Sequence, residues 1–392
     1  MEKIVFTEKF CSPEDLFPFT LTRQIQDIRV GILTIREKWE QYLGLPSFDK
    51  QEDDYKDLDR SIIIDENIGK DVLYLVHGNL LPTPRIIKQV KKLKPGEFLS
   101  LPDKENFVYC ISKDQVINEF KIKAQKAVEL KEDLIEIRYP WDILKLNAWA
   151  IQQDFDLLKK SNKGQTIPIS NKATNSKNIF IEKGAQVEHC FLNATDGPIY
   201  IGKNAVVMEG AMLRGPVSIG DGAVVKMGAK IYGATSVGPG CIVGGEIKNS
   251  VLFANSNKAH DGYLGDSIIG EWCNLGAGTS NSNIKNNASE ICVYTPSGQK
   301  NVGLKCGVIM GDYSRTAINT SINTGTVIGV CCNIFGSGLT PKYIPSFSWG
   351  SEGIKRYEFE KAITHINNWK AFKDQSLSNN ETSILNHIFD HY

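Results

Sequence analysis

Residues 201–244 read IGKNAVVMEGAMLRGPVSIGDGAVVKMGAKIYGATSVGPGCIVG and decide the fold of this chain. A branched aliphatic residue recurs in them at every sixth position, and a small or compact residue usually follows four places later. The anchors are Ile201, Val207, Leu213, Ile219, Val225, Ile231, Val237 and Val243. A period of six fits neither an amphipathic helix nor an alternating strand. It is typical of a solenoid with three flat faces per coil, so we predict a left-handed parallel β-helix with inward anchors.

The period extends beyond this stretch and is interrupted twice. It is present at residues 181–187, and it returns around Val302 and Ile328. Between these regions it resumes with a shift of two residues, at Val251, Tyr263, Ile269 and Leu275. The breaks fall at residues 249–262 and 280–300. Because an inserted loop in a solenoid often builds the functional site, we expect the chemistry at these breaks.

The composition restricts the class of protein. A length of 392 residues suggests two or three domains. The 45 basic and 45 acidic side chains give no net charge that would favour nucleic acid or an anionic membrane. The chain has no apolar run of membrane-spanning length and no signal-like start, so we expect a cytoplasmic protein.

The nine cysteines do not form a disulfide or zinc pattern. Four of them fall at the small position that follows an anchor, namely Cys241, Cys273, Cys306 and Cys332. We therefore predict that these four pack in the core.

Polar residues able to do chemistry gather around the first break. The stretches are EIKNS at residues 246–250, AHDGYLGD at 259–266 and NLGAGT at 274–279. In motif and spacing they resemble the acetyltransferase domain of the bifunctional enzymes that acetylate glucosamine-1-phosphate and couple the product to UTP, giving UDP-N-acetylglucosamine. The likeness is strong over about 55 residues and diffuse elsewhere.

The resemblance implies a role for each side chain. His260 would be the general base that takes a proton from the sugar amine as it attacks the thioester of acetyl-CoA. Lys248 would bind the sugar phosphate, while Tyr263 and Asn274 would hold the sugar. The backbone N–H of Ala277 would face the oxyanion of the tetrahedral intermediate.

Two positions depart from the family pattern. Lys230 stands where the family has arginine, so the positive charge is kept and the two-pronged grip on phosphate is lost. Asp312 replaces a serine of the family's acyl-CoA site, and a carboxylate there would repel the CoA phosphates. A lone loop histidine is more often a surface or structural residue, and only its company favours catalysis for His260.

The N-terminal region lacks the six-residue period. Strand-like runs at residues 3–6, 61–64 and 72–76 alternate with helix-like runs such as 84–94. They predict an α/β domain with a partly parallel sheet.

Parts of this region resemble the sugar-nucleotidyltransferase fold. Residues 16–39 look like an altered start of that fold, and residues 71–81 look like its strand that ends in Gly-Asp, whose aspartate holds Mg²⁺. The resemblance implies Arg23 and Lys38 on the phosphates of UTP or dTTP, with Asn79 near the metal. However, the glycine-rich phosphate loop is missing, and the amide of Asn79 replaces a carboxylate. The domain either keeps transferase activity or has decayed to a support for the β-helix.

We therefore expect four parts along the chain. An α/β domain with a connecting helix at 143–159 would occupy residues 1–160, and a polar linker would follow at 161–178. The β-helix would occupy 179–345. Residues 346–392 would contain a helix at 352–372, which packs against the last coil or a neighbour, and a mobile polar tail.

Three hypotheses follow. The first is an enzyme of amino-sugar nucleotide synthesis that uses acetyl-CoA to acetylate a sugar phosphate such as glucosamine-1-phosphate, assembled as the homotrimer that the resemblance implies. The second is a working nucleotidyltransferase half, with the β-helix as oligomeriser. The third is a structural or regulatory trimer that has lost both activities.

Overall fold

The structure, a computed structural model, describes residues 2–8, 11–47, 72–101, 104–112, 116–118, 121–122, 126–131, 133–353 and 355–392. These residues form two compact units. The first unit contains Met1–Leu16, Arg23–Ile28 and Leu33–Arg138, and the second contains Phe17–Thr22, Arg29–Ile32 and Tyr139–Tyr392. The strand expected at residues 61–64 lies outside the described residues.

The first unit is built on a mixed sheet with the strand order β1-β2-β4-β3-β7. Its strands are β1 (Lys3–Thr7), β2 (Val72–His77), β3 (Glu97–Leu101), β4 (Lys104–Ser112) and β7 (Lys126–Glu129), and a separate pair is formed by β5 (Val116–Asn118) and β6 (Lys121–Ile122). Its helices are α1 (Ile35–Leu43) and α2 (Pro84–Val90). Because β1 pairs with β2 and β3 pairs with β7 in parallel, the predicted partly parallel α/β sheet is confirmed.

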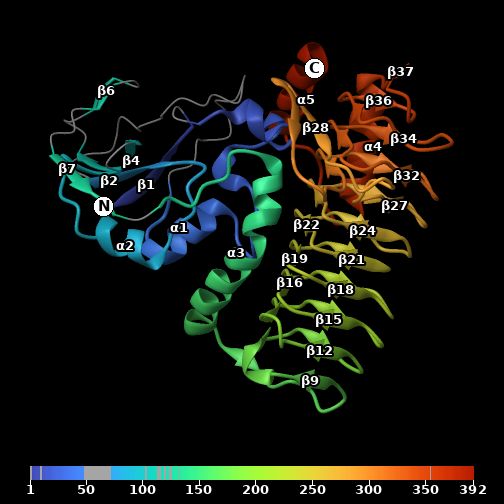
Figure 1. The fold of residues 1–392 in the computed structure, drawn as a ribbon, viewed down its shortest axis with the longest axis horizontal. Helices are drawn as coiled ribbons and strands as arrows, with labels where there is room; N and C mark the ends of the chain where they lie inside the picture. Colours follow the sequence, from blue (N-terminus) through green and yellow to red (C-terminus); the bar gives the residue numbers. More distant parts are fainter. Residues whose placement is uncertain are drawn as a thin grey trace. The chain divides into compact units, whose positions relative to one another are not determined.

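The second unit is a parallel β-helix whose strands stack into three faces (Figure 1). Face 1 contains β8 (Gly164–Gln165), β10 (Ile179–Glu182), β13 (Ile199–Ile201), β16 (Val217–Ile219), β19 (Thr235–Val237), β22 (Val251–Leu252), β25 (Ile268–Ile269), β30 (Ile309–Met310), β33 (Val327–Ile328) and β35 (Tyr343–Ile344). Face 2 contains β11 (Gln186–Val187), β14 (Val206–Val207), β17 (Val224–Val225), β20 (Ile242–Val243), β23 (Asn257–Lys258), β26 (Asn274–Leu275), β31 (Arg315–Thr316), β34 (Asn333–Ile334), β36 (Ser348–Trp349) and β37 (Lys355–Arg356). Face 3 contains β9 (Lys172–Thr174), β12 (Phe191–Asn193), β15 (Met212–Arg214), β18 (Lys230–Tyr232), β21 (Glu246–Lys248) and β24 (Tyr263–Gly265), and the pair β27 (Ser280–Asn281) and β32 (Ser321–Ile322) follows β24.

The predicted anchors form the core of this β-helix. All eight anchors of residues 201–244 are at most 2% exposed. Successive coils place Val207 beside Val225 and Val225 beside Val243, so that each full coil consists of three repeats. The four cysteines predicted to pack are also buried. Burial raises the pKa of each thiol, which makes a reactive thiolate unfavourable.

The two register breaks have different causes. At the first, Val243 pairs with Lys258, whereas a coil of three full repeats would bring Asp261 to that place. The inward positions Val243, Ile247 and Leu252 are only four and five residues apart, so the coil is shortened there and no loop is inserted. The inward residues after it are Leu252 and Leu264, and the expectation that Tyr263 is an inward anchor was wrong. A strand exposes alternate side chains, so Tyr263 faces outward on face 3.

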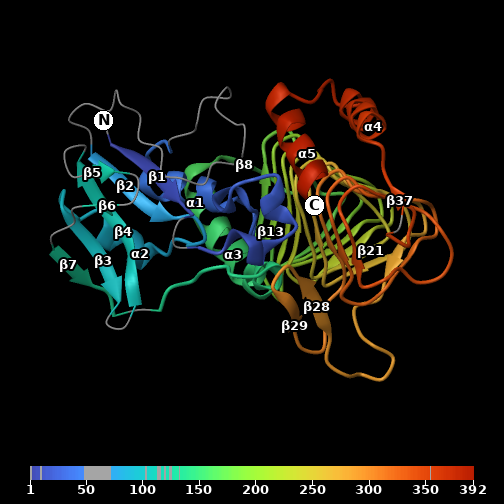
Figure 2. The same ribbon diagram turned by 90° about the horizontal axis from the view of Figure 1, so that it is seen from above.

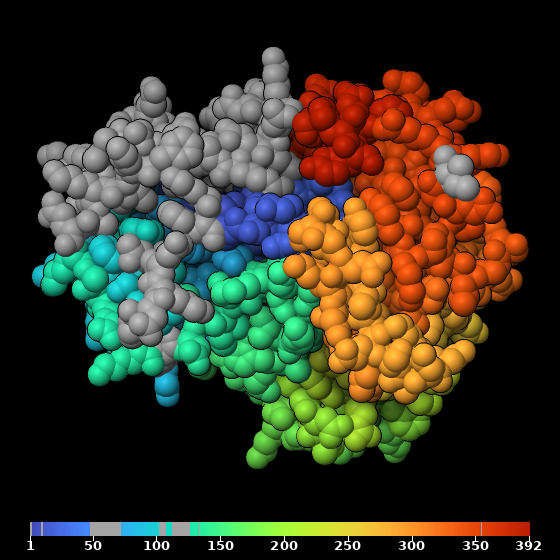
Figure 3. Space-filling view, turned by 45° about the horizontal axis from the view of Figure 1, so that its top comes forward, coloured from blue at the N-terminus to red at the C-terminus, as the bar shows by residue number. Residues whose placement is uncertain are grey.

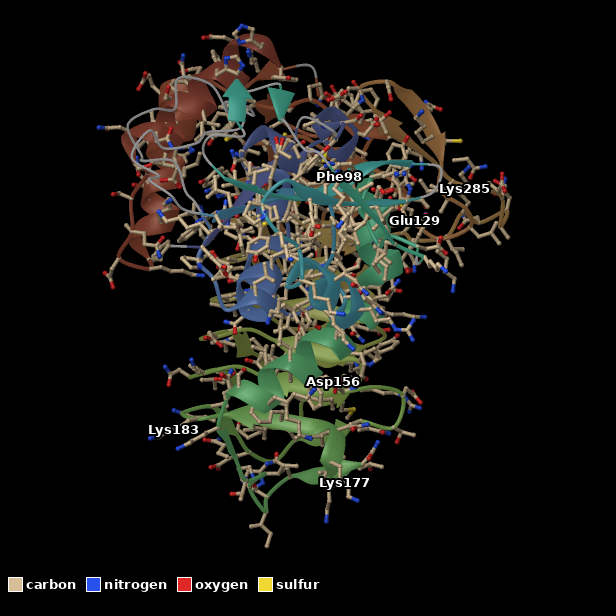
Figure 4. All side chains as sticks on the ribbon, turned by 90° about the vertical axis from the view of Figure 1, so that its left-hand side faces the viewer. Phe98, Glu129, Asp156, Lys177, Lys183 and Lys285 are labelled. Atoms are coloured by element: carbon tan, nitrogen blue, oxygen red, sulfur yellow. The ribbon has the colours of Figure 1, made fainter. Side chains whose placement is uncertain are left out.

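The second break is an insertion. The chain leaves the coil after β27 and forms the antiparallel hairpin β28 (Cys292–Thr295) and β29 (Gly298–Asn301). Val302 adjoins this hairpin and is not an inward anchor. The hairpin projects from the stack of coils in Figure 2 and stands out on the surface in Figure 3. Lys285, at the start of the insertion, is labelled in Figure 4.

Helix α3 (Pro140–Ser161) lies where the connecting helix of the α/β domain was expected, but it belongs to the second unit. It packs on the outer side of face 1, against β19 and β22. The Asn147 side chain accepts a hydrogen bond from Ser236 Oγ at 3.0 Å and donates one to the Ala234 carbonyl. Residues 161–178, expected to be a linker, contain β8 and β9, which pair with β10 and β12. The first coil of the β-helix therefore begins inside that segment.

Two helices, α4 (Phe359–Ala371) and α5 (Asn379–His391), cover the corner between faces 1 and 2. This 1–2 corner carries the buried side chains of Trp272, Tyr313, Cys331 and Phe347. The expected mobile tail was wrong, because Ser378 and Glu381 form a capping box that begins α5. Within the described ranges, no helix is long and apolar enough to cross a membrane.

Candidate active site

The outer side of face 3 aligns the predicted sugar-binding residues. Strand pairing places Lys230 beside Glu246 and Glu246 beside Tyr263, on three successive coils. A second outward row contains Tyr232, Lys248 and Gly265 in the same register. Neighbouring strands lie about 4.8 Å apart, so the side chains of both rows are in contact range.

Lys248 lies against aromatic and acidic neighbours. Its Nζ is 5.7 Å from the centre of the Tyr232 ring. The Tyr232 hydroxyl donates to Glu246 Oε1 at 2.7 Å, and this bond raises the pKa of Tyr232 to about 12. The phenol therefore stays protonated and holds the Glu246 carboxylate in place.

Tyr263 is held on the other side of Lys248. Its ring folds over Gly265, where an added Cβ atom would clash with the tyrosine hydroxyl. Asn283 Nδ2 donates to this hydroxyl at 3.1 Å and to Asp266 Oδ2 at 2.5 Å. Asn249 Nδ2 donates to the second oxygen of Asp266 at 2.6 Å. These hydrogen bonds join Tyr263, Asp266, Asn249 and Asn283 into one polar network. Asn283 comes from the start of the insertion.

His260 is exposed at the corner between faces 2 and 3, called here the 2–3 corner. It follows β23, and its turn stacks on Gly245, where a Cβ atom would lie 2.9 Å from the His260 carbonyl. Gly262 closes the turn with a φ of 124°, which only glycine adopts easily. Glycine on both sides thus lets this turn stack closely and present the imidazole to solvent.

The turn of the next coil contains Ala277. Gly278 N–H donates to the Asp261 carbonyl at 3.0 Å, which joins this turn to the turn of His260. Within the part of the chain that the structure describes, no carbonyl accepts a hydrogen bond from the Ala277 N–H. Asn274 precedes this turn on face 2, across the corner from Lys248 and Tyr263. One chain therefore distributes the predicted site over both sides of the 2–3 corner.

Asp312 lies on a different corner from His260. It occupies the 1–2 corner after β30 and is 3% exposed. Its carboxylate accepts hydrogen bonds from the Thr22 hydroxyl at 2.7 Å and from the Glu271 N–H at 2.8 Å. This position does not support Asp312 as part of the acyl-CoA site, and the expected repulsion of CoA phosphates is unfounded.

The nucleotide-binding residues predicted in the first unit are buried. Lys38 in α1 is 2% exposed, and Arg23 is 9% exposed. Asn79 is also buried, and its amide accepts from the Cys11 thiol and donates to the Ile137 carbonyl at 3.2 Å. No cluster of three or more His, Cys, Asp or Glu side chains occurs among the described residues. The Asn79 amide is therefore engaged in hydrogen bonds within the protein, and its role at Mg²⁺ stays a prediction.

The segment that replaces the glycine-rich loop packs on the β-helix within the second unit. Phe19 lies 5.0 Å from the ring of Phe253, and Thr22 bonds Asp312. The Leu21 N–H donates to the Pro18 carbonyl at 3.3 Å and the Thr22 N–H to the Phe19 carbonyl at 3.5 Å, so these two backbone donors are used within the segment.

Sequence reasoning missed several residues of the site. These are Tyr232, Asp266 and Asn283, together with a role for Glu246. Once the shortened coil is known, spacing identifies the outward ones, because the strand register then places Tyr232 directly beside Lys248. Spacing does not identify Asn283, because this residue belongs to the insertion and lies outside the repeat.

Comparisons with known proteins agree with this organisation. Residues 4–163 match the family model described as sugar nucleotidyl transferase, and residues 198–233 match bacterial transferase hexapeptide repeats. The chain is 29% identical over 243 residues to the bifunctional protein GlmU of Methanocaldococcus jannaschii, covering 59% of this chain and 51% of the relative. It is also 29% identical over 213 residues to the bifunctional sugar-1-phosphate nucleotidylyltransferase/acetyltransferase of Sulfurisphaera tokodaii, covering 54% of this chain and 47% of the relative.

The chain thus spans about half the length of these relatives. A solved Arabidopsis UDP-N-acetylglucosamine acyltransferase covers 58% of this chain and 97% of its own, at 12% identity and a TM-score of 0.28, which is too low to support an inference. The resemblance to the bifunctional family is confirmed by sequence.

Proposed function

We propose that this relative of bifunctional nucleotidylyltransferase/acetyltransferases transfers an acyl group from acyl-CoA to the amine of a sugar phosphate, with acetyl-CoA and glucosamine-1-phosphate as the first candidates. The observation that carries the proposal is the alignment of Lys230, Lys248 and Tyr263 on face 3, beside the exposed His260. This edge offers cations for a phosphate, hydroxyl and amide groups for a sugar, and a base for an amine.

The acceptor would lie across face 3. The ammonium groups of Lys230 and Lys248 would bind the phosphate, and Glu246 and Tyr263 would bind sugar hydroxyls. Asn274 on face 2 would complete the contacts around the corner. The amine would then lie at the imidazole of His260.

The reaction follows from these positions. The imidazole takes a proton as the amine nitrogen attacks the thioester carbonyl, and the Ala277 N–H donates to the oxyanion that forms. Collapse of the intermediate breaks the C–S bond and leaves the amide, and the CoA thiolate takes the proton back from the imidazolium.

The donor would run along the 2–3 corner. Two coils beyond Ala277, a cavity of 340 Å³ is lined by Phe335, Trp349, Ser351 and Lys355, among others. From the strand holding Asn274 to the strand holding Trp349 there are three strand spacings, about 14 Å. An extended pantetheine arm spans that length, so the cavity would take the nucleotide of CoA, with an indole to stack on and a lysine for phosphate.

A second copy of the chain would complete the site. Large apolar side chains are exposed along the 2–3 corner, with Met227 71% and Ile318 69% exposed. Such a column favours an interface between chains. We propose a homotrimer in which the 2–3 corner faces a neighbouring copy and the site is shared.

The test is His260→Ala, with His189→Ala as the matched control. His189 is an exposed histidine lower on the same corner. Loss of the base should lower kcat/KM for acetyl transfer to glucosamine-1-phosphate by about 10²- to 10⁴-fold. The control should keep wild-type rates, and both variants should keep the oligomeric mass of the wild type. Unchanged activity in His260→Ala would show that the base is misassigned.

A second candidate function is sugar-1-phosphate nucleotidyl transfer, and the family match over residues 4–163 favours it. Mg²⁺-dependent release of pyrophosphate from UTP or dTTP, on adding a sugar-1-phosphate, would support this function. Absence of release with both nucleotides and a panel of sugars would eliminate it.

A further inference from the structure

Lys258 occupies an inward position of the β-helix. It pairs with Val243 on the coil below, and the neighbouring Asn257 pairs with Asn274, which places Leu275 on the coil above it. The side chain is 1% exposed. The other inward residues of this row include Val207 and Val225, both buried aliphatics. A lysine at this point interrupts an apolar column.

Packing alone does not account for this lysine. Burial of an ammonium group costs several kcal/mol, and an apolar side chain of similar volume would fill the space at no such cost. The nearby inward positions are Val243, Leu252, Leu264 and Leu275, all aliphatic. Burial lowers the pKa of Lys258 to about 8, against the opposing charge of Asp261.

The ammonium group makes one contact that bears on the site. Lys258 Nζ donates a hydrogen bond to the backbone carbonyl of His260. The lysine thus reaches from the coil interior into the turn that presents the imidazole. The turn also stacks on Gly245 below it, and the Gly262 carbonyl accepts a hydrogen bond from the Glu246 N–H at 3.2 Å.

We propose that Lys258 is a positioning residue that holds the His260 turn from inside the coil, so that the imidazole meets the acceptor amine. This inference rests on the proposed acyltransferase function for its catalytic consequence. Its structural part, that Lys258 restrains the His260 turn, can be measured without an activity assay.

The experiment compares wild type with Lys258→Met, which keeps the length of the side chain and removes the donor. Leu275→Met is the matched control, because it changes the adjacent inward position and keeps its volume. We expect kcat to fall about 10- to 100-fold in Lys258→Met, with both KM values within threefold, since a displaced base affects the chemical step more than binding. Leu275→Met should keep wild-type constants.

Hydrogen exchange followed by mass spectrometry supplies the second readout. In Lys258→Met, amides of residues 259–263 should exchange at least tenfold faster, with strands β21 and β26 unchanged. Should Lys258→Met fail to fold, Lys258→Gln takes its place in both measurements, with smaller effects of the same sign because its amide can still donate.

Unchanged exchange in the turn together with unchanged kcat would overturn the inference. An equal loss in Leu275→Met would also overturn it, because the effect would then be general core packing. If wild type shows no acyl transfer, the proposed function fails, and the exchange rates alone decide whether Lys258 holds the turn.

Discussion

The 1–2 corner and the 2–3 corner belong to the same coils and have opposite surroundings. The first is lined by buried rings such as Phe347, and α4 and α5 cover it. The second presents His260 and Ile318 to solvent, with apolar side chains above and below. A solenoid repeats its backbone at every corner, so the backbone alone does not distinguish them. The 2–3 corner, which no helix covers among the described residues, is therefore the corner available for substrate and for a second chain.

The largest expected effect comes from charging the uncovered corner. Ile318→Asp should reduce the mass in analytical ultracentrifugation to that of one chain and lower acetyl transfer by about 100-fold or more, since an unpaired charge buried at an interface costs about 3–5 kcal/mol. The control is Phe372→Asp, at an exposed residue beside α4 on the other corner. An oligomer that survives Ile318→Asp would place the interface elsewhere.

The covered corner should respond in stability. Phe347 is fully buried, and its ring lies 5.1 Å from Phe389 and 6.1 Å from Phe359. Phe347→Ala should lower the free energy of unfolding by about 3–5 kcal/mol, measured by denaturant titration. Phe335→Ala, on the uncovered corner and 40% exposed, should lose far less. Equal losses would remove the distinction between the corners.

The buried Lys258, inside the coil at the uncovered corner, should make the free energy of unfolding depend on pH. The pKa of Lys258 is about 8 in the folded chain and 10.5 ordinarily, so between these values the unfolded chain holds the extra proton and stability rises with pH. Wild type should therefore gain about 2–3 kcal/mol relative to Lys258→Met between pH 8 and 10.5. A difference that stays constant with pH would mean that Lys258 is not buried as an ammonium group.

A smaller effect is expected from Gly265→Ala. The added methyl group would meet the Tyr263 hydroxyl, so the ring must leave its place beside Lys248. The KM for the sugar phosphate should rise about tenfold, as expected for the loss of about one hydrogen bond to a charged or polar partner. In a Tyr263→Ala background the same change should have no further effect, and an additive loss would show that Gly265 acts in another way.

The sequence by itself determined the coil and the neighbourhood of the candidate site. A six-residue period states which side chains face inward from spacing alone, and the eight anchors of residues 201–244 are all buried. The motif that joins Lys248 to His260 and Tyr263 is also local, and the structure places Tyr263 on face 3 next to the turn of His260, with Lys248 beside Gly265 on the same face.

Tertiary structure decided the rest, because it depends on which coil lies beside which. The shortening of one coil turned Tyr263 outward and Lys258 inward, and only pairing with Val243 reveals this. Asp312 stands at a position of the family's acyl-CoA motif, yet it lies at the covered corner. Burial also places Asn79 in hydrogen bonds within the protein, which its motif did not indicate. Spacing along a chain specifies a face of the coil, whereas packing between distant segments specifies whether that face meets solvent.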